Sequence, residues 1–263
     1  MTTYDPKVTP YFERLGRQRF RATDSVQGAW NTTEQHIAPA LGLLAHAVER
    51  DHTSRHETPF QLARASYDIL GTIPIADVDI EVRVLRPGRT IELVEATLSH
   101  DRRAAVVLRA WMLAPRDTTT LAGTTPPPMP PRHDLEAWSA TAIWPGLFVT
   151  TIDIRRREHH PGRAEFWLRP RVPLLAGETV SPTARMLGVI DIANGITPRT
   201  SPRAVAFPNI DLTAHLTRAP EGDWIGCSTT VTFGPDGIGT THTALHDQAG
   251  YLGTAAQSLT VRP

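Results

Sequence analysis

The stretch of sequence that decides the fold is Phe207-Pro208-Asn209-Ile210-Asp211-Leu212-Thr213-Ala214-His215-Leu216. Polar and apolar residues alternate along it, and two further strand-like runs follow before the chain ends. Because alternate side chains of a β-strand point to the same face, polar groups from three neighbouring strands can meet at one point. We expect Asp211, Thr232 and Gln257 to meet in this way.

Composition limits the class of protein. The chain has 263 residues, 40% of them hydrophobic, which is enough for one large domain or two of moderate size. Its formal net charge of +0 argues against nucleic-acid partners and anionic membrane surfaces. The one cysteine, Cys227, excludes an internal disulfide and a cysteine-built metal site. With no apolar run of the roughly 18 residues that a membrane span needs, we expect a cytoplasmic protein.

The first half of the chain predicts one buried helix followed by an antiparallel meander. Residues 36–48 are apolar on nearly every side, which is typical of a central helix, and Pro39 is tolerated only in a first turn. From Phe60 to Leu113 the period changes to two, with turns between four strand-like runs. A helix combined with such a meander indicates an α+β unit.

The second half repeats this order after an interruption rich in proline and threonine. Residues 115–135 contain Pro126-Pro127-Pro128-Met129-Pro130-Pro131, which favours an extended polyproline linker. The matching turns at Asp101 and Asp247 precede last strands that carry Trp111 and Gln257, each ten residues later. We therefore predict an N-terminal unit over 1–114, a linker over 115–135 and a C-terminal unit over 136–263.

Several motifs resemble one known family, the TesB-like acyl-CoA thioesterases of the double hotdog type. They keep their order along nearly the whole chain: Gly28-Ala29-Trp30-Asn31 with Gln35-His36, Tyr67-Asp68-Ile69-Leu70-Gly71, Val84-Leu85-Arg86-Pro87-Gly88-Arg89, Pro173-Leu174-Leu175-Ala176-Gly177-Glu178 with Ser181-Pro182, Asp191 with Asn194-Gly195, Asn209 to Leu216, and Gly234-Pro235-Asp236-Gly237-Ile238-Gly239. The resemblance implies two hotdogs, each with a central helix wrapped by an antiparallel sheet, and a thioester bound between them.

The resemblance also implies a hydrolase site in which an Asp, a hydroxyl and a Gln hold the attacking water. These roles map onto Asp211, Thr232 and Gln257, although Ser228 and Thr230 share the strand phase of Thr232. No cofactor and no metal are implied, because the coenzyme A portion belongs to the substrate. The expected partner is an acyl-CoA or another acyl thioester, and flat sheet faces of this fold make a homo-oligomer a possible assembly.

Three further residues are candidates for substrate binding. Asp191 lies on an apolar helix and must find a polar partner there, Asn194 follows it, and His36 precedes the first helix. Where many relatives have a glycine pair before that helix, this chain has residues 37–39, which we expect to narrow acyl entry or remove a donor amide. His36 keeps open a hotdog hydratase or dehydratase, and a non-catalytic thioester-binding protein is the third alternative.

Overall fold

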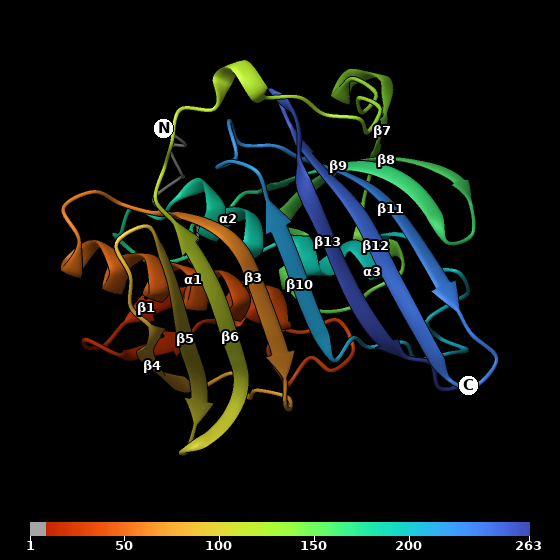
Figure 1. Cartoon of the computed structure of the whole chain (residues 1–263). Helices are drawn as coiled ribbons and strands as arrows, with labels where there is room; N and C mark the ends of the chain where they lie inside the picture. The colour runs from red at the N-terminus through yellow and green to blue at the C-terminus, as the bar shows by residue number, and fades with distance from the viewer. Residues whose placement is uncertain (1–8) are drawn as a thin grey trace.

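The computed structural model describes residues 9–263, so the first eight residues of the predicted N-terminal unit lie outside the described part. Its main feature is a 13-stranded sheet in the order β1-β2-β4-β5-β6-β3-β10-β13-β12-β11-β9-β8-β7, which spans both halves of the chain (Figure 1). The N-terminal half contributes β1 (Phe12–Arg14), β2 (Arg19–Ala22), β3 (Gln61–Ile69), β4 (Asp77–Arg86), β5 (Ile91–His100) and β6 (Arg103–Leu113). The C-terminal half contributes β7 (Glu136–Trp138), β8 (Ile152–His160), β9 (Arg163–Pro170), β10 (Asp211–Leu216), β11 (Ile225–Phe233), β12 (Ile238–Asp247) and β13 (Gly250–Thr260).

The strand order confirms the internal repeat. Outward from the centre, the sheet has β3-β6-β5-β4-β2 on one side and β10-β13-β12-β11-β9 on the other. Strands at matching positions on the two sides come in the same order along their halves of the chain. The two halves join where β3 pairs antiparallel with β10, and we call this line of pairing the seam. The register sets Asp68 opposite Asp211 across the seam. A hydrogen bond of 2.9 Å between the hydroxyls of Ser66 and Thr213 also crosses it.

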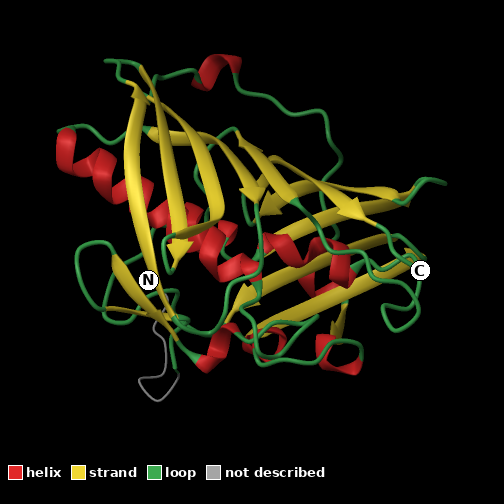
Figure 2. Ribbon diagram, turned by 90° about the horizontal axis from the view of Figure 1, so that it is seen from below, coloured by secondary structure: helices red, strands yellow, loops and turns green. Residues whose placement is uncertain are grey.

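The first central helix, α1 (Ile37–Arg55), lies inside the curve of the sheet (Figure 2). It begins two residues before Pro39, and His36 is its N-cap, with Nδ1 accepting from the Ala38 N–H at 3.2 Å. Leu41, Leu43 and Leu44 are fully buried in the hydrophobic core, each contributing about 2 kcal/mol of hydrophobic stabilisation. The continuous apolar pattern thus predicted a helix covered on most sides.

The second central helix is interrupted. It consists of α2 (Pro182–Leu187), the 3₁₀ turn η6 (Ile190–Ile192) and α3 (Ala193–Ile196). Ser181 caps α2, its hydroxyl accepting from the Ala184 N–H at 3.0 Å. Where α1 crosses α2, a Cβ atom placed on Gly42 would lie 2.7 Å from both the Ala184 carbonyl oxygen and Gly188 Cα. The two helices therefore meet backbone to backbone, which only glycine at position 42 allows.

The segment between β6 and β7 arches over one end of the molecule (Figure 1). It contains the short 3₁₀ turns η2 (Thr119–Leu121) and η3 (Arg132–Asp134) within otherwise extended chain. The Trp167 indole N–H bonds to the Pro130 carbonyl at 3.0 Å, and His246 Nε2 contacts the Pro127 carbonyl at 3.2 Å. These contacts attach the segment to the C-terminal half. The remaining 3₁₀ turns are η1 (Asp24–Val26), η4 (Ala140–Ala142) and η5 (Phe148–Thr151).

Candidate functional site

A cavity of about 540 Å³ lies at the seam, at the end of the sheet where β3 stops and β10 begins. The N-terminal half lines it with Trp30, the start of α1 and the loop after β3. The C-terminal half adds Asp191 from η6, Asn194 from α3 and the segment 208–210. Both repeats therefore build its walls, as expected for a ligand held between two hotdogs.

Asp191 is the centre of a polar cluster beside this cavity. Its Oδ1 accepts hydrogen bonds from Asn209 Nδ2 at 2.7 Å and from Gln257 Nε2 at 3.0 Å. Gln257 Nε2 also donates to the Asp191 backbone carbonyl at 2.9 Å. Within residues 9–263, Oδ2 of Asp191 has no hydrogen-bond partner. The two amides thus fix one carboxylate oxygen and leave the other for a ligand.

Burial makes Asp191 a stronger base than an ordinary aspartate. The side chain is 3% exposed, and this burial raises its pKa to about 6, although the hydrogen bonds from Asn209 and Gln257 act in the opposite direction. A carboxylate with this pKa is largely ionised at neutral pH and binds a proton more readily than a solvated one. These are the properties that a general base requires.

Gln257 and Thr241 lie side by side on the inner face of the sheet. They are direct cross-strand partners on β13 and β12, and both are buried. Oε1 of Gln257 and Oγ1 of Thr241 lack hydrogen-bond partners in the described part of the chain. The Gln257 carbonyl can accept a hydrogen bond and the Thr241 hydroxyl can donate or accept one, so a buried water molecule would satisfy both.

The start of α1 faces the same cavity. His36 and Ile37 both line it, and the Ile37 N–H has no acceptor among residues 9–263. The N-terminus of a 19-residue helix carries a partial positive charge, which favours a developing negative charge nearby. The Ile37 N–H is therefore a candidate donor, and whether residues 37–39 narrow acyl entry stays a prediction.

His36 is held as a neutral donor. Burial lowers its pKa to about 3, and its ring stacks on Phe148 with centroids 4.2 Å apart. Because Nδ1 accepts from the Ala38 N–H, the single proton of the neutral ring is on Nε2. His36 thus has no free lone pair with which to act as the base of a hydratase.

Asn194 lines the cavity beside Asp191, and backbone groups hold its side chain. Oδ1 accepts from the Gly195 N–H at 2.7 Å, and Nδ2 lies 3.5 Å from the Phe207 carbonyl oxygen. The side chain is 7% exposed. Its predicted role in substrate binding stays a prediction.

The structure does not bring Asp211, Thr232 and Gln257 together. Gln257 faces the interior, whereas Thr232 is exposed on the opposite face of the sheet, as is Thr230. Asp211 is half-buried at the start of β10, and its Oδ1 accepts from the Ser258 N–H at 2.5 Å. The predicted convergence of these three side chains is wrong because strand alternation turns Thr232 to the face opposite Gln257, while the Asp211 carboxylate bonds to the backbone of β13 and not to Gln257.

The first repeat has no equivalent of Asp191. His46, like Asp191, lies ten residues beyond the N-cap of its helix, and its Nε2 contacts Glu178 at 3.4 Å. Arg14 and Arg50 also bind Glu178, and the hydrogen bond from Arg14 contributes most to lowering the pKa of this carboxyl to about 2. Glu178 lines a second hollow of about 600 Å³ as an ion-paired carboxylate. We assign the candidate reaction site to the seam cavity alone.

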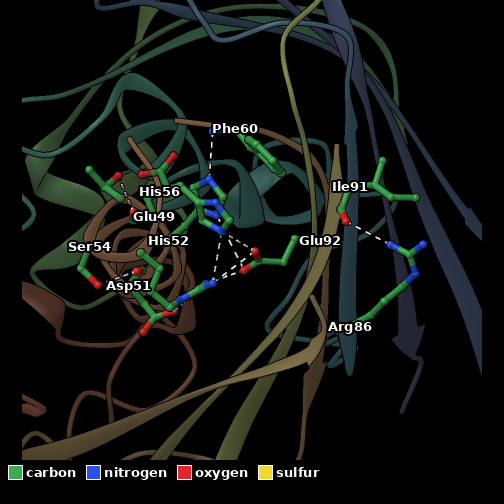
Figure 3. Close-up of polar contacts among 11 residues, drawn as sticks. Glu49, Asp51, His52, Ser54, His56, Phe60, Arg86, Ile91 and Glu92 are labelled. Carbon is green, nitrogen blue, oxygen red and sulfur yellow. Dashed lines mark hydrogen bonds and ion pairs between the residues drawn. The ribbon is translucent and has the colours of Figure 1, made fainter. Parts of the chain in front are cut away.

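One further cluster has the residue types of a metal site. Ligand atoms of His52, His56 and Glu92 lie within 4.8 Å of one another at the end of α1 (Figure 3). However, His52 Nε2 accepts from the Phe60 N–H at 3.0 Å, so its Nδ1, which faces Glu92, carries the proton. A metal-bound histidine instead donates its other ring N–H. Arg55 already pairs with Glu92, so the cluster fits a buried ion pair better than a metal site.

Replacing Arg55 with alanine is expected to lower the free energy of unfolding by about 2 to 3 kcal/mol, because the fully buried Glu92 loses its permanent cation. Burial alone would raise the pKa of Glu92, but Arg55 and His56 lower it overall. The stabilisation from the Arg55–Glu92 pair is therefore fully present above the pKa that Glu92 has in the unfolded chain. It is lost as the pH falls through the lower pKa of the folded state. Urea unfolding at neutral and acidic pH measures both effects.

Arg83→Ala is the matched control, because its pair with Glu95 is mostly exposed on the Arg83 side. Its expected cost is below about 1 kcal/mol. Equal costs for the two variants would contradict the importance of the buried pair.

The fold defines a double hotdog protein with a cavity lined by both of its repeats. A family model of the acyl-CoA thioesterase C-terminal domain matches residues 123–261, and one of the N-terminal domain matches residues 26–113. The chain belongs to the TesB-like acyl-CoA thioesterase family and is a thioester hydrolase. No curated protein matches it.

Solved structures confirm the double hotdog fold. A conserved protein of unknown function with a hot dog fold from Alicyclobacillus acidocaldarius has a TM-score of 0.74 at 15% identity, covering 96% of each chain. Acyl-CoA thioesterase II TesB2 from Mycobacterium marinum has a TM-score of 0.67 at 15% identity, covering 95% of each chain. The tesB protein of Mycobacterium avium subs paratuberculosis has a TM-score of 0.64 at 18% identity, covering 96% of each chain.

Within residues 9–263, none of the helices combines the length and the apolar character needed to cross a bilayer.

Proposed function

We propose that the chain hydrolyses acyl-CoA at the seam cavity, with Asp191 as the general base. The observation that carries this proposal is the state of Asp191, which is buried, has a pKa of about 6 and has one oxygen free of protein hydrogen bonds. Asn209 and Gln257 orient the carboxylate, so no reorganisation is needed when it takes up a proton.

In the proposed mechanism, a water molecule attacks the thioester carbonyl. A water that donates to Asp191 Oδ2 and Gln257 Oε1 directs a lone pair at a thioester carbonyl in the cavity. As the C–O bond forms, Asp191 takes the water proton, and the Ile37 N–H stabilises the oxyanion. The C–S bond then breaks and the proton passes from Asp191 to the leaving sulfur. The products are a carboxylic acid and coenzyme A.

The coenzyme A portion occupies the open side of the cavity. Arg262 and Thr260 line it there, next to the exposed Leu70. An arginine at this position suits a phosphate of the nucleotide part, since guanidinium groups bind phosphate oxygens in pairs. The reaction itself needs no metal and no redox cofactor.

The hydratase alternative has weaker support. It requires a base with a free lone pair near the substrate, and His36 offers only the Nε2–H donor. An enoyl-CoA incubated with the protein separates the two reactions. Hydrolysis releases a free thiol and hydration does not. A protein that only binds thioesters would do neither.

The pH dependence tests the role of Asp191 directly. We expect kcat/KM for thiol release to rise about tenfold per pH unit below about 6 and to level off above it, because only the ionised carboxylate accepts the water proton. Substrate binding is checked by measuring KM separately across the same range. A profile that stays flat through about pH 6, or falls there, would contradict the assignment of Asp191 as the base.

A further inference from the structure

The seam cavity continues into a small apolar pocket. The two share Ala29, Trp30, His36 and Asn194, so the pocket opens where Asp191 meets the start of α1. Its deeper wall comes from aliphatic and aromatic side chains of the C-terminal half, among them Val149, Ile152, Ile154, Ile192 and Trp144. Such a lining suits a hydrocarbon chain.

The pocket is short. Its volume is about 30 Å³. Since one water-sized sphere needs about 10 to 15 Å³ by this measure, the pocket accepts about two or three groups of methylene size beyond the carbonyl carbon.

Trp144 forms the wall between the pocket and the molecular surface. Its indole N–H donates to the Gly195 carbonyl at 2.9 Å, and its ring packs edge-on against Trp30 with centroids 4.6 Å apart. Both indoles also line a surface hollow of about 480 Å³ beyond the pocket. The two rings therefore form the partition between the pocket and this hollow.

We infer that this pocket holds the acyl group and restricts the enzyme to acyl chains of about two to four carbons, with Trp144 as the residue that sets the limit. The inference rests on the proposed function, because it places the thioester carbonyl at Asp191. The acyl carbons then point away from Arg262 and into the apolar pocket. Longer chains meet the ring of Trp144.

The test is kcat/KM for thiol release from acetyl-, butyryl- and octanoyl-CoA. For the wild type we expect butyryl-CoA to exceed octanoyl-CoA at least about tenfold. For Trp144→Ala, which joins the pocket to the surface hollow, we expect octanoyl-CoA to gain at least about tenfold relative to butyryl-CoA. Trp111→Ala is the control, because this half-buried ring lies on β6, outside both cavities, and its ratio should equal that of the wild type.

A second variant tests the limit in the opposite direction without opening the core. Ala140 lines the pocket and is 3% exposed, so Ala140→Leu fills it. We expect butyryl-CoA hydrolysis to fall at least about tenfold relative to acetyl-CoA hydrolysis.

The possible failures are distinguishable. No thiol release by the wild type from any of the three substrates would refute the proposed function. Hydrolysis with octanoyl-CoA equal to or better than butyryl-CoA would refute only the inferred chain limit. Ratios of kcat/KM between substrates that stay at the wild-type values in both pocket variants would also refute the inferred chain limit.

Discussion

Replacing Asp191 with asparagine is expected to lower kcat for acyl-CoA hydrolysis about a thousandfold, within the range typical for loss of a general base. An asparagine oxygen can still accept from Asn209 and Gln257, so the local hydrogen bonds and the fold should persist. The amide cannot take up the water proton, so the loss should fall on kcat with KM nearly unchanged. Thiol release under substrate saturation, with unfolding by urea as a check on stability, measures both.

Asp211→Asn is the matched control. Its carboxylate accepts from the Ser258 N–H, and Asp211 does not line the seam cavity, so kcat should stay within about threefold of the wild type. A large loss in Asp211→Asn together with full activity in Asp191→Asn would instead support the site that the sequence alone predicted.

Replacing Gly42 with leucine is expected to lower the free energy of unfolding by about 3 kcal/mol. A side chain at this position meets the backbone of residues 184 and 188, which cannot move aside as a flexible side chain would. The substitution separates α1 from α2, the helix pair that holds the two hotdogs together beneath the sheet. Urea unfolding, with an unchanged m-value as evidence of two-state behaviour, measures the loss.

The control for this variant is Gly123→Leu. Gly123 lies in the segment between β6 and β7, and no atom is within 4 Å of a Cβ placed there. Its expected effect is within about 0.5 kcal/mol. A similar loss in both variants would show that leucine itself, and not the helix crossing, lowers the stability.

Much of the architecture follows from the sequence because it depends on local patterns. The apolar residues around Leu41 to Leu44 predict a central helix covered on most sides, and period-two runs predict the strands that cover it. The recurrence of this order after the proline-rich segment predicts two copies of one fold. The break in the second helix at Gly188 was missed, and it lies where that helix approaches Gly42, a residue far away in the sequence.

The convergence of Asp211, Thr232 and Gln257 was predicted less well because it depends on strand phase. The sequence selected both Asp191 and Asp211, the first for binding and the second as base, and the choice of base between them stays a prediction that the two asparagine variants test. A shift of one residue moves a strand side chain to the other face, and the phase of β10 relative to β13 is set by pairing that a single sequence does not reveal.

Thr241 and Asn209 were missed for related reasons. The alternation of side chains along β12 places Thr241 on the inner face beside Gln257. The sequence instead predicted that the hydroxyl would come from the serine and threonine residues of β11. Asn209 precedes β10 in an irregular segment, so no periodicity indicated where its side chain would point. The signal available was Asp191 itself, since a carboxylate on an apolar helix needs amide donors close by.

The most direct measurement is a crystal structure of the protein with a non-hydrolysable butyryl-CoA analogue in which a methylene group separates the sulfur from the carbonyl. The account predicts that the carbonyl oxygen accepts from the Ile37 N–H, that its carbon faces Asp191 Oδ2, and that the propyl group lies against Trp144. A carbonyl bound on the outer face near Asp211 and Thr232, or in the hollow beside Glu178, would contradict it.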